Sequence, residues 1–125
     1  MKRLMMVTGA LLVLALVAIT APASSKTAAY RHYVACGLSE KAKPSHVCEK
    51  KRDKGAFFRS NQADVFYTVC VRFPTGKHAC KGHQQAIQGT LYVNKITSNI
   101  PGRHTVSWFV SGKKVGEFSF LVSNG

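Results

Sequence analysis

Apolar and polar residues alternate along much of the chain beyond residue 30, a pattern typical of half-buried β-strands. The alternation is clearest over residues 65–73. One side of this stretch would carry an apolar row of Val65, Tyr67, Val69, Val71 and Phe73. The other side would carry Phe66, Thr68, Cys70 and Arg72. The pattern therefore predicts a strand whose first row faces a core and whose second row, with Cys70, faces water.

Two further apolar rows lie near the C-terminus on either side of a turn. The rows are Val106, Trp108, Val110 and Phe118, Phe120, Val122. Both face one core only if the residues between them shift the pairing correctly. A three-residue loop at 112–114 would do this, and so would a two-residue turn at Ser111-Gly112 with a bulge near Gly116. Both arrangements remain open from the sequence.

Shorter strand patterns complete the list of expected elements. They cover residues 30–36, 55–60 and 89–97, and no segment has helical periodicity. Only the stretch 81–88 lacks a strand pattern. Six or seven short strands at regular spacing in about 100 residues fit an all-β sandwich better than a closed barrel. We therefore expect one antiparallel β-sandwich domain over residues 30–125.

Part of this pattern resembles a known family. The segments are Ala63–Val71 and Pro101–Gly116, and the second reads PG-x-x-x-V-x-W-x-V-x-G-x-x-V-G. They are similar to the ending of bacterial immunoglobulin-like domains, in particular to small secreted proteins that are mostly uncharacterised. The resemblance covers about residues 55–122 and implies an Ig-like sandwich. Unlike antibody-type domains, the chain has no Trp between cysteines, because Trp108 follows all four. The resemblance implies no catalytic or binding residues.

The first residues have the three parts of a secretory signal. Lys2-Arg3 precedes an apolar run over 4–19, and Ala21-Pro22-Ala23 fits a cleavage site. The run is interrupted by Thr8-Gly9 and is shorter than the ~20 residues of a typical membrane span, which argues against an anchor. We expect a cleaved signal peptide over 1–23, a flexible N-terminus over 24–29 and a secreted, extracellular protein.

Export makes disulfides the expected state of the four cysteines, Cys36, Cys48, Cys70 and Cys80. A hairpin with a three-residue loop at 74–76 pairs Phe73 with Lys77 and places Cys70 opposite Cys80. Opposed strand positions can be close enough for a disulfide. This leaves Cys36 to pair with Cys48. The alternative pairing, 36–70 with 48–80, would join two sheets and is less favoured.

Positive charge is the feature most relevant to partners. The chain has 18 Lys and Arg against 5 Asp and Glu, and removal of residues 1–23 leaves a net charge of +11. If strands 55–60 and 64–73 are antiparallel neighbours, the basic run at 50–54 and the hairpin tip lie at one end of the sandwich. The predicted basic patch comprises Lys50, Lys51, Arg52, Lys54 and Lys77. Anionic wall polymers or membrane surfaces are natural targets, whereas specific nucleic-acid recognition is not expected. The competing explanation is a solvated charge that keeps the protein soluble.

Candidate chemistry is sparse. His78, Cys80 and His83 lie within six residues, but a structural zinc site needs four ligands and the disulfide consumes Cys80. No spacing selects a catalytic pair among the few carboxylates and histidines. We therefore expect no enzyme activity, cofactor or metal. The first hypothesis is a binding module for anionic polymers. A module that recruits a protein partner by strand addition and a small hydrolase such as a ribonuclease are the alternatives.

Overall fold

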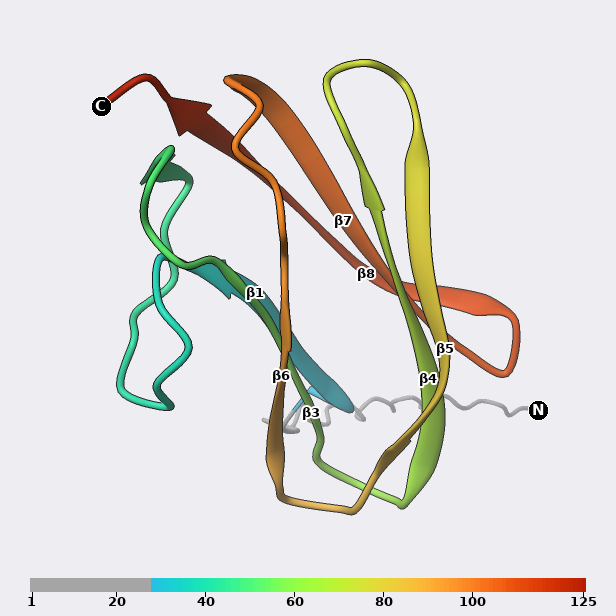
Figure 1. Ribbon diagram of the computed structural model, residues 1–125. Helices are drawn as coiled ribbons and strands as arrows, with labels where there is room; N and C mark the ends of the chain where they lie inside the picture. The colour runs from blue at the N-terminus through green and yellow to red at the C-terminus, as the bar shows by residue number, and fades with distance from the viewer. Residues whose placement is uncertain (1–27) are drawn as a thin grey trace, which may run out of the picture.

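Residues 28–125 form eight strands in two sheets (Figure 1). The computed structural model describes residues 28–125, so the expected leader and residues 24–27 lie outside the described residues. The strands are β1 (Tyr30–Ala35), β2 (Val47–Glu49), β3 (Gly55–Ser60), β4 (Val65–Arg72), β5 (His78–Ala86), β6 (Leu91–Lys95), β7 (Gly102–Val110) and β8 (Lys113–Ser123). None of the described residues forms a helix, so this part of the chain contains no helix that could cross a membrane.

The smaller sheet has the order β1-β3-β6 and the larger sheet the order β2-β8-β7-β4-β5. The expected all-β sandwich is confirmed. Every pairing is antiparallel except β2 with β8, which is parallel over three residue pairs. The sequence analysis missed β2 because three residues are too few to show alternation.

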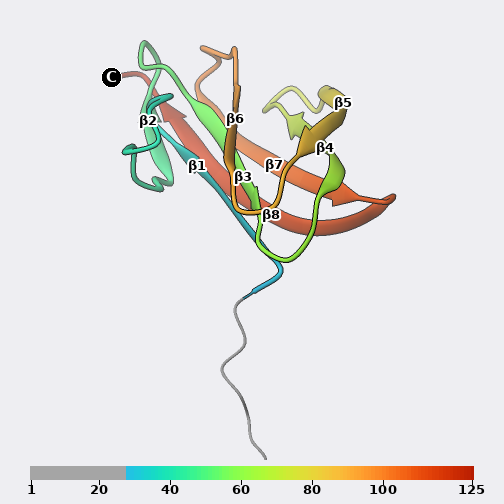
Figure 2. The same cartoon turned by 90° about the horizontal axis from the view of Figure 1, so that it is seen from below.

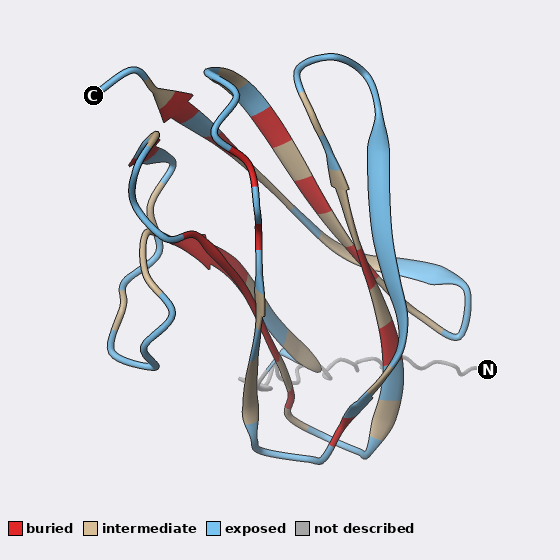
Figure 3. Cartoon of the chain, in the orientation of Figure 1, coloured by how far each residue is buried: buried red, intermediate tan, exposed pale blue. Residues whose placement is uncertain are grey.

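The core lies between the two sheets, and the alternating rows supply it. Figure 3 shows buried positions recurring along β7, where His104, Val106 and Trp108 each have no exposed surface. Phe58 of β3 stacks on Tyr67 of β4 with ring centroids 4.3 Å apart, so the two sheets meet directly. The row predicted for residues 65–73 therefore faces the core, as expected.

The β7–β8 hairpin adopts the second of the two predicted arrangements. Val110 pairs with Lys113 across a two-residue turn, and both Ser111 (φ 52°) and Gly112 (φ 78°) are left-handed, as a type I′ turn requires. The register then shifts between Trp108 and Phe109, which places the bulge beside Gly116. A Cβ atom at Gly116 would overlap the His32 ring, so this position needs glycine.

The hairpin between β4 and β5 also matches the prediction. The Phe73 amide donates to the Lys77 carbonyl (2.9 Å) across the loop at 74–76. Cys70 is the direct partner of Cys80 and is bonded to it, on the sheet face that points away from the core. The second disulfide joins Cys36 to Cys48. The favoured connectivity is confirmed.

β5 extends beyond the prediction, because residues 81–86 lack the alternation that a half-buried strand shows. As an edge strand it is exposed at most positions, and pairing with β4 alone holds it. The register places Ala79 and Lys81 on the inner side, opposite Val71 and Val69. A bulge then follows, where His83 has a φ of 53°. A small residue and a lysine thus stand where the other strands carry large apolar side chains.

The expected pairing of strands 55–60 and 64–73 is wrong. β3 pairs with β1 and β6, whereas β4 pairs with β5 and β7. The turn at 61–64 carries the chain from one sheet to the other, which explains why Phe58 and Tyr67 meet face to face. A chain that crosses between sheets still reverses its direction. The basic run before β3 and the hairpin tip after β4 therefore remain at the same end of the sandwich (Figure 1).

Candidate functional site

Three connecting segments form the end of the sandwich that carries the predicted patch. They are the turn at 50–54, the loop at 97–101 and the hairpin tip at 74–77. Figures 1 and 2 show the loop between the other two, and the contacts agree. The Asn99 side-chain amide contacts the Lys50 carbonyl, and Thr97 to Ile100 line a hollow of about 440 Å³ with Thr75, Lys77 and His78. We call this surface the end face.

Four of the five predicted patch residues belong to this end face. Lys51, Arg52 and Lys77 are exposed and Lys50 is half-buried. The ion pairs of residues 28–125 are Lys95 with Asp53 and Lys114 with Glu117, so these four cations have no carboxylate partner in the described chain. The turn also contains the exposed carboxylate of Asp53, and the exposed carboxylate of Glu49 lies directly before it, at the end of β2. The three cations of the turn and Lys77 lie on opposite sides of an uncharged loop.

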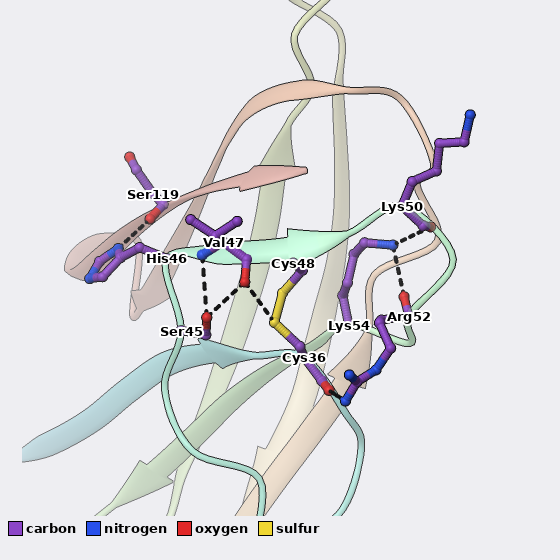
Figure 4. The surroundings of a disulfide bond; sticks show 9 residues. All are labelled: Cys36, Ser45, His46, Val47, Cys48, Lys50, Arg52, Lys54 and Ser119. Atoms are coloured by element: carbon purple, nitrogen blue, oxygen red, sulfur yellow. Dashed lines mark hydrogen bonds between the residues drawn. A yellow bond between two sulfur atoms is a disulfide. The ribbon is translucent and has the colours of Figure 1, made fainter. Parts of the chain in front are cut away.

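Lys54, the fifth predicted patch residue, is a correction. Only 2% of Lys54 is exposed, and its ammonium donates hydrogen bonds to the carbonyls of Lys50 (3.0 Å) and Arg52 (2.8 Å) (Figure 4). Burial lowers the pKa of Lys54, and the nearby Asp53 carboxylate opposes this effect. Lys54 therefore closes the turn from inside and cannot reach an external ligand. The dense basic run in the sequence hid this role, because a buried and an exposed lysine look alike there.

Arg52 connects the end face to the disulfide loop. Its guanidinium donates to the Cys36 carbonyl (2.9 Å), as Figure 4 shows. Arg52 also lines a hollow of about 520 Å³ together with Lys41 and Lys43 of the loop closed by the Cys36–Cys48 disulfide. These cations extend the positive surface around the side of the molecule. The sequence contains both lysines, but only the folded loop places them next to Arg52.

A buried histidine supports the central loop of the end face. The His104 ring accepts or donates at both nitrogens, with Ser98 Oγ at 2.8 Å from Nε2 and the Gly102 carbonyl at 3.0 Å from Nδ1. The carbonyl can only accept, so Nδ1 carries a proton and Nε2 accepts from the Ser98 hydroxyl in the neutral ring. Burial lowers the pKa of His104; the Gly102 bond opposes this and the Lys54 charge lowers it further. The neutral ring thus positions residues 98–102.

The histidines beside the hairpin disulfide do not form a cluster. Cys80 is bonded to Cys70, while His78 and His83 line different hollows. Within residues 28–125 no three His, Cys, Asp or Glu side chains are placed to hold a metal ion.

Comparison with protein-family models and with curated proteins found no match. Among solved structures, the chain is similar to an immunoglobulin-like protein from Pseudomonas aeruginosa. The two are 14% identical, the match covers 74% of this chain and 90% of that chain, and the TM-score is 0.53. This likeness shows an Ig-like fold. The two disulfides indicate an oxidising environment outside the cytoplasm.

Proposed function

We propose that this protein is an exported, non-enzymatic Ig-like module that binds anionic polymers of a cell envelope or extracellular surface through its end face. The binding residues are Lys50, Lys51, Arg52 and Lys77, with Lys54 removed from the set because it is buried. The observation that carries the proposal is that these four cations lie at one end of the sandwich, on either side of an uncharged loop, without carboxylate partners in the described chain. Unpaired cations on one surface attract polyanions and accelerate their association.

The end face offers affinity without a shaped polar pocket. The hollow beside Lys77 has few charged groups, because its polar lining consists of threonine, serine and asparagine side chains around one lysine and one histidine. Contacts of this kind recognise charge density rather than one chemical group. We therefore expect binding that weakens steeply as salt rises.

The test compares a lysine pair of the end face with a lysine pair at the opposite end of the sandwich. Lys50→Gln/Lys51→Gln removes two charges from the end face. Lys113→Gln/Lys114→Gln removes two from the start of β8, beside the β7–β8 turn, and Lys113→Gln alone is measured as well because Lys114 forms an ion pair with Glu117 and lines a hollow of the larger sheet. Binding to a sulfated dextran is measured at several salt concentrations. The end-face variant should lower the slope of log K against log salt by about 1.5, because each lost contact removes about 0.7–0.9 on a nucleic-acid-like polyanion. The turn variant should change it less.

Equal losses from both pairs would mean that only net charge matters, and the end-face proposal would be wrong. Lys77→Gln is a further check, since this residue lies across the loop from the turn. An additional decrease in the slope with Lys77→Gln would extend the site over the whole end face. An unchanged slope would confine it to the turn at 50–52.

Strand addition is the second candidate function, and β5 opposes it at its own edge. An inward lysine and a bulge are features that prevent an edge strand from pairing with another chain, and β5 has both at Lys81 and His83. Strand addition would therefore have to use one of the other edge strands, β1 or β6 in the smaller sheet or β2 in the larger one. Such binding would persist at high salt, which distinguishes it from the end-face proposal.

A further inference from the structure

The outer face of the larger sheet has an ordered set of side chains that the core does not use. The register arranges them in rows across β5, β4, β7 and β8. The first rows contain Phe66, then Thr68 beside Phe109, then the Cys80–Cys70 disulfide beside Ser107. The last row runs from His78 through Arg72 and Thr105 to Ser119. We call this surface the sheet face.

Phe66 is the most exposed large apolar residue described, with 62% of its surface accessible. It lies on the outer side of β4, and Phe109, on β7, lies diagonally across from it and is half-buried. Two adjoining aromatic side chains with exposed surface offer apolar area that a partner can cover. The folded domain gains little by keeping Phe66 in water.

The sheet face is hollowed rather than flat. Two depressions of about 400 Å³ and 370 Å³ share Phe109 as a common wall. The first extends toward Arg72 and His78, and the second toward Phe66 and His83. In both, β4 and β7 supply the floor, while β5 lies on one side and β8 or the 111–112 turn on the other. Together they form one elongated track along the sheet.

The chemistry changes along this track. Aromatic rings lie at one end, with Thr68 beside Phe109, the hydroxyl of Ser107 lies between, and Arg72, His78 and Thr105 lie at the other end. Lys114 and Glu117 form an ion pair (2.7 Å) at the β8 side. The track thus presents flat apolar rings, hydroxyls that donate and accept, and a guanidinium suited to a carboxylate.

We propose that the sheet face binds an acidic polysaccharide built from carboxylated pyranose sugars. The apolar faces of the sugar rings pack on Phe66 and Phe109, sugar hydroxyls bond to the hydroxyl side chains, and a carboxylate pairs with Arg72. Sugars fit better than single-stranded nucleic acid, because each pyranose ring carries several hydroxyls that can donate to the oxygens of Thr68 and Ser107, whereas the phosphate that follows every nucleotide can only accept. This site adjoins the end face at His78, which lines a hollow of each surface, and it adds a preference for ring-bearing polymers.

The experiment uses the full oxidised chain and three probes. Oligogalacturonate carries carboxylates on pyranose rings, polyacrylate carries carboxylates without rings, and oligothymidylate carries phosphates with bases. Phe66→Ala should weaken oligogalacturonate binding about tenfold, a loss in the range of one aromatic contact, and leave polyacrylate binding unchanged. Phe66→Tyr should restore binding because it keeps the ring. Arg72→Gln should weaken binding of the two carboxylated probes.

The matched control is Val93→Ala, which removes another exposed apolar side chain on β6, in the smaller sheet and therefore away from the track. It should change none of the three affinities. The proposal is overturned if Phe66→Ala leaves oligogalacturonate binding intact, or if it weakens polyacrylate equally. Tighter binding of oligothymidylate than of oligogalacturonate, lost in Phe66→Ala, would replace the sugar with nucleic acid.

The same measurements keep the two sites distinguishable. Lys50→Gln/Lys51→Gln should weaken oligogalacturonate and polyacrylate by similar factors, since the end face recognises charge. If Phe66→Ala weakens oligogalacturonate binding as expected and the lysine variant has no effect, the sheet-face proposal is supported and the end-face proposal is wrong. If the lysine variant weakens binding and Phe66→Ala does not, only the sheet-face proposal is wrong.

Discussion

The two disulfides close loops of similar length but hold very different parts of the molecule. Cys36–Cys48 spans 12 residues and Cys70–Cys80 spans 10, so restriction of the unfolded chain gives each about 3 kcal/mol. Cys48 is 1% exposed and the bond joins the end of β1 to β2, in the other sheet. Cys70 and Cys80 are already paired on one sheet and face outward. Any difference in the stability lost on removing each bond therefore reports what that bond does in the folded state.

Removing the Cys36–Cys48 bond, which we call the inner disulfide, should have the largest effect on stability. Cys36→Ala/Cys48→Ala should lower the free energy of unfolding by about 4 kcal/mol, in the upper part of the range for such bonds. Without the bond, β2 depends on three residue pairs with β8. Cys70→Ala/Cys80→Ala is the matched control and should cost about 2–3 kcal/mol, because the β4–β5 register remains. Urea unfolding of both variants gives the comparison.

Hydrogen exchange tests where the inner bond acts. Amides of β2 should lose protection in Cys36→Ala/Cys48→Ala, while those of β4 keep it. Equal costs and equal exchange patterns for both variants would show that the bonds act only on the unfolded chain.

The buried side chain of Lys54, in the turn that follows β2, allows a smaller change near the Cys36–Cys48 bond. Lys54→Met keeps most of the side-chain volume and removes both hydrogen bonds to the carbonyls of residues 50 and 52. Bonds from a charged donor contribute about 1.5–3 kcal/mol each when burial leaves the acceptors without water. We expect a loss of about 2 kcal/mol in unfolding free energy, because the turn can relax toward solvent. Lys51→Met, on the exposed side of the turn, should change stability by less than about 0.5 kcal/mol.

Acid should produce the smallest effect, through His104. Its pKa in the folded protein lies below the ordinary value of 6.5. The unfolded chain therefore binds a proton that the folded protein resists, and stability falls as the pH drops below 6.5. Burial lowers the pKa of His32 as well and acts in the same direction.

Urea unfolding at pH 7.5 and pH 5.5 measures this loss. His104→Gln should reduce the difference between the two values, whereas His78→Gln, on the exposed hairpin, should leave it unchanged. An unchanged difference in His104→Gln would remove His104 as its source.

The sequence predicted the parts of the fold that depend on neighbouring residues. Pro74-Thr75-Gly76 set the hairpin register and with it the Cys70–Cys80 bond. The two apolar rows near the C-terminus limited the β7–β8 turn to two choices, one of which is correct. Period-two alternation is a local signal, so it locates strands well.

The sequence could not show which strands share a sheet. β3 and β4 are adjacent in the chain yet lie in different sheets, because the pairing of β3 with β6 and of β4 with β7 joins strands that are distant in the sequence and leaves no local pattern. The candidate site divides in the same way. A basic run shows where cations lie, but only the fold turns Lys54 inward and brings Arg52 to Cys36. The rows of the sheet face also depend on pairing between distant strands.

The lysine on the inner side of β5 has a consequence for how the protein behaves at high concentration. A valine at position 81 would continue the apolar row of Val69 and Val71. The edge of the larger sheet would then be flat and hydrophobic, which favours pairing with other molecules and fibrous assembly. Lys81 instead leaves a small gap of about 220 Å³ between the sheets. The domain forgoes some core packing and keeps its long outer strand from joining that of a second molecule.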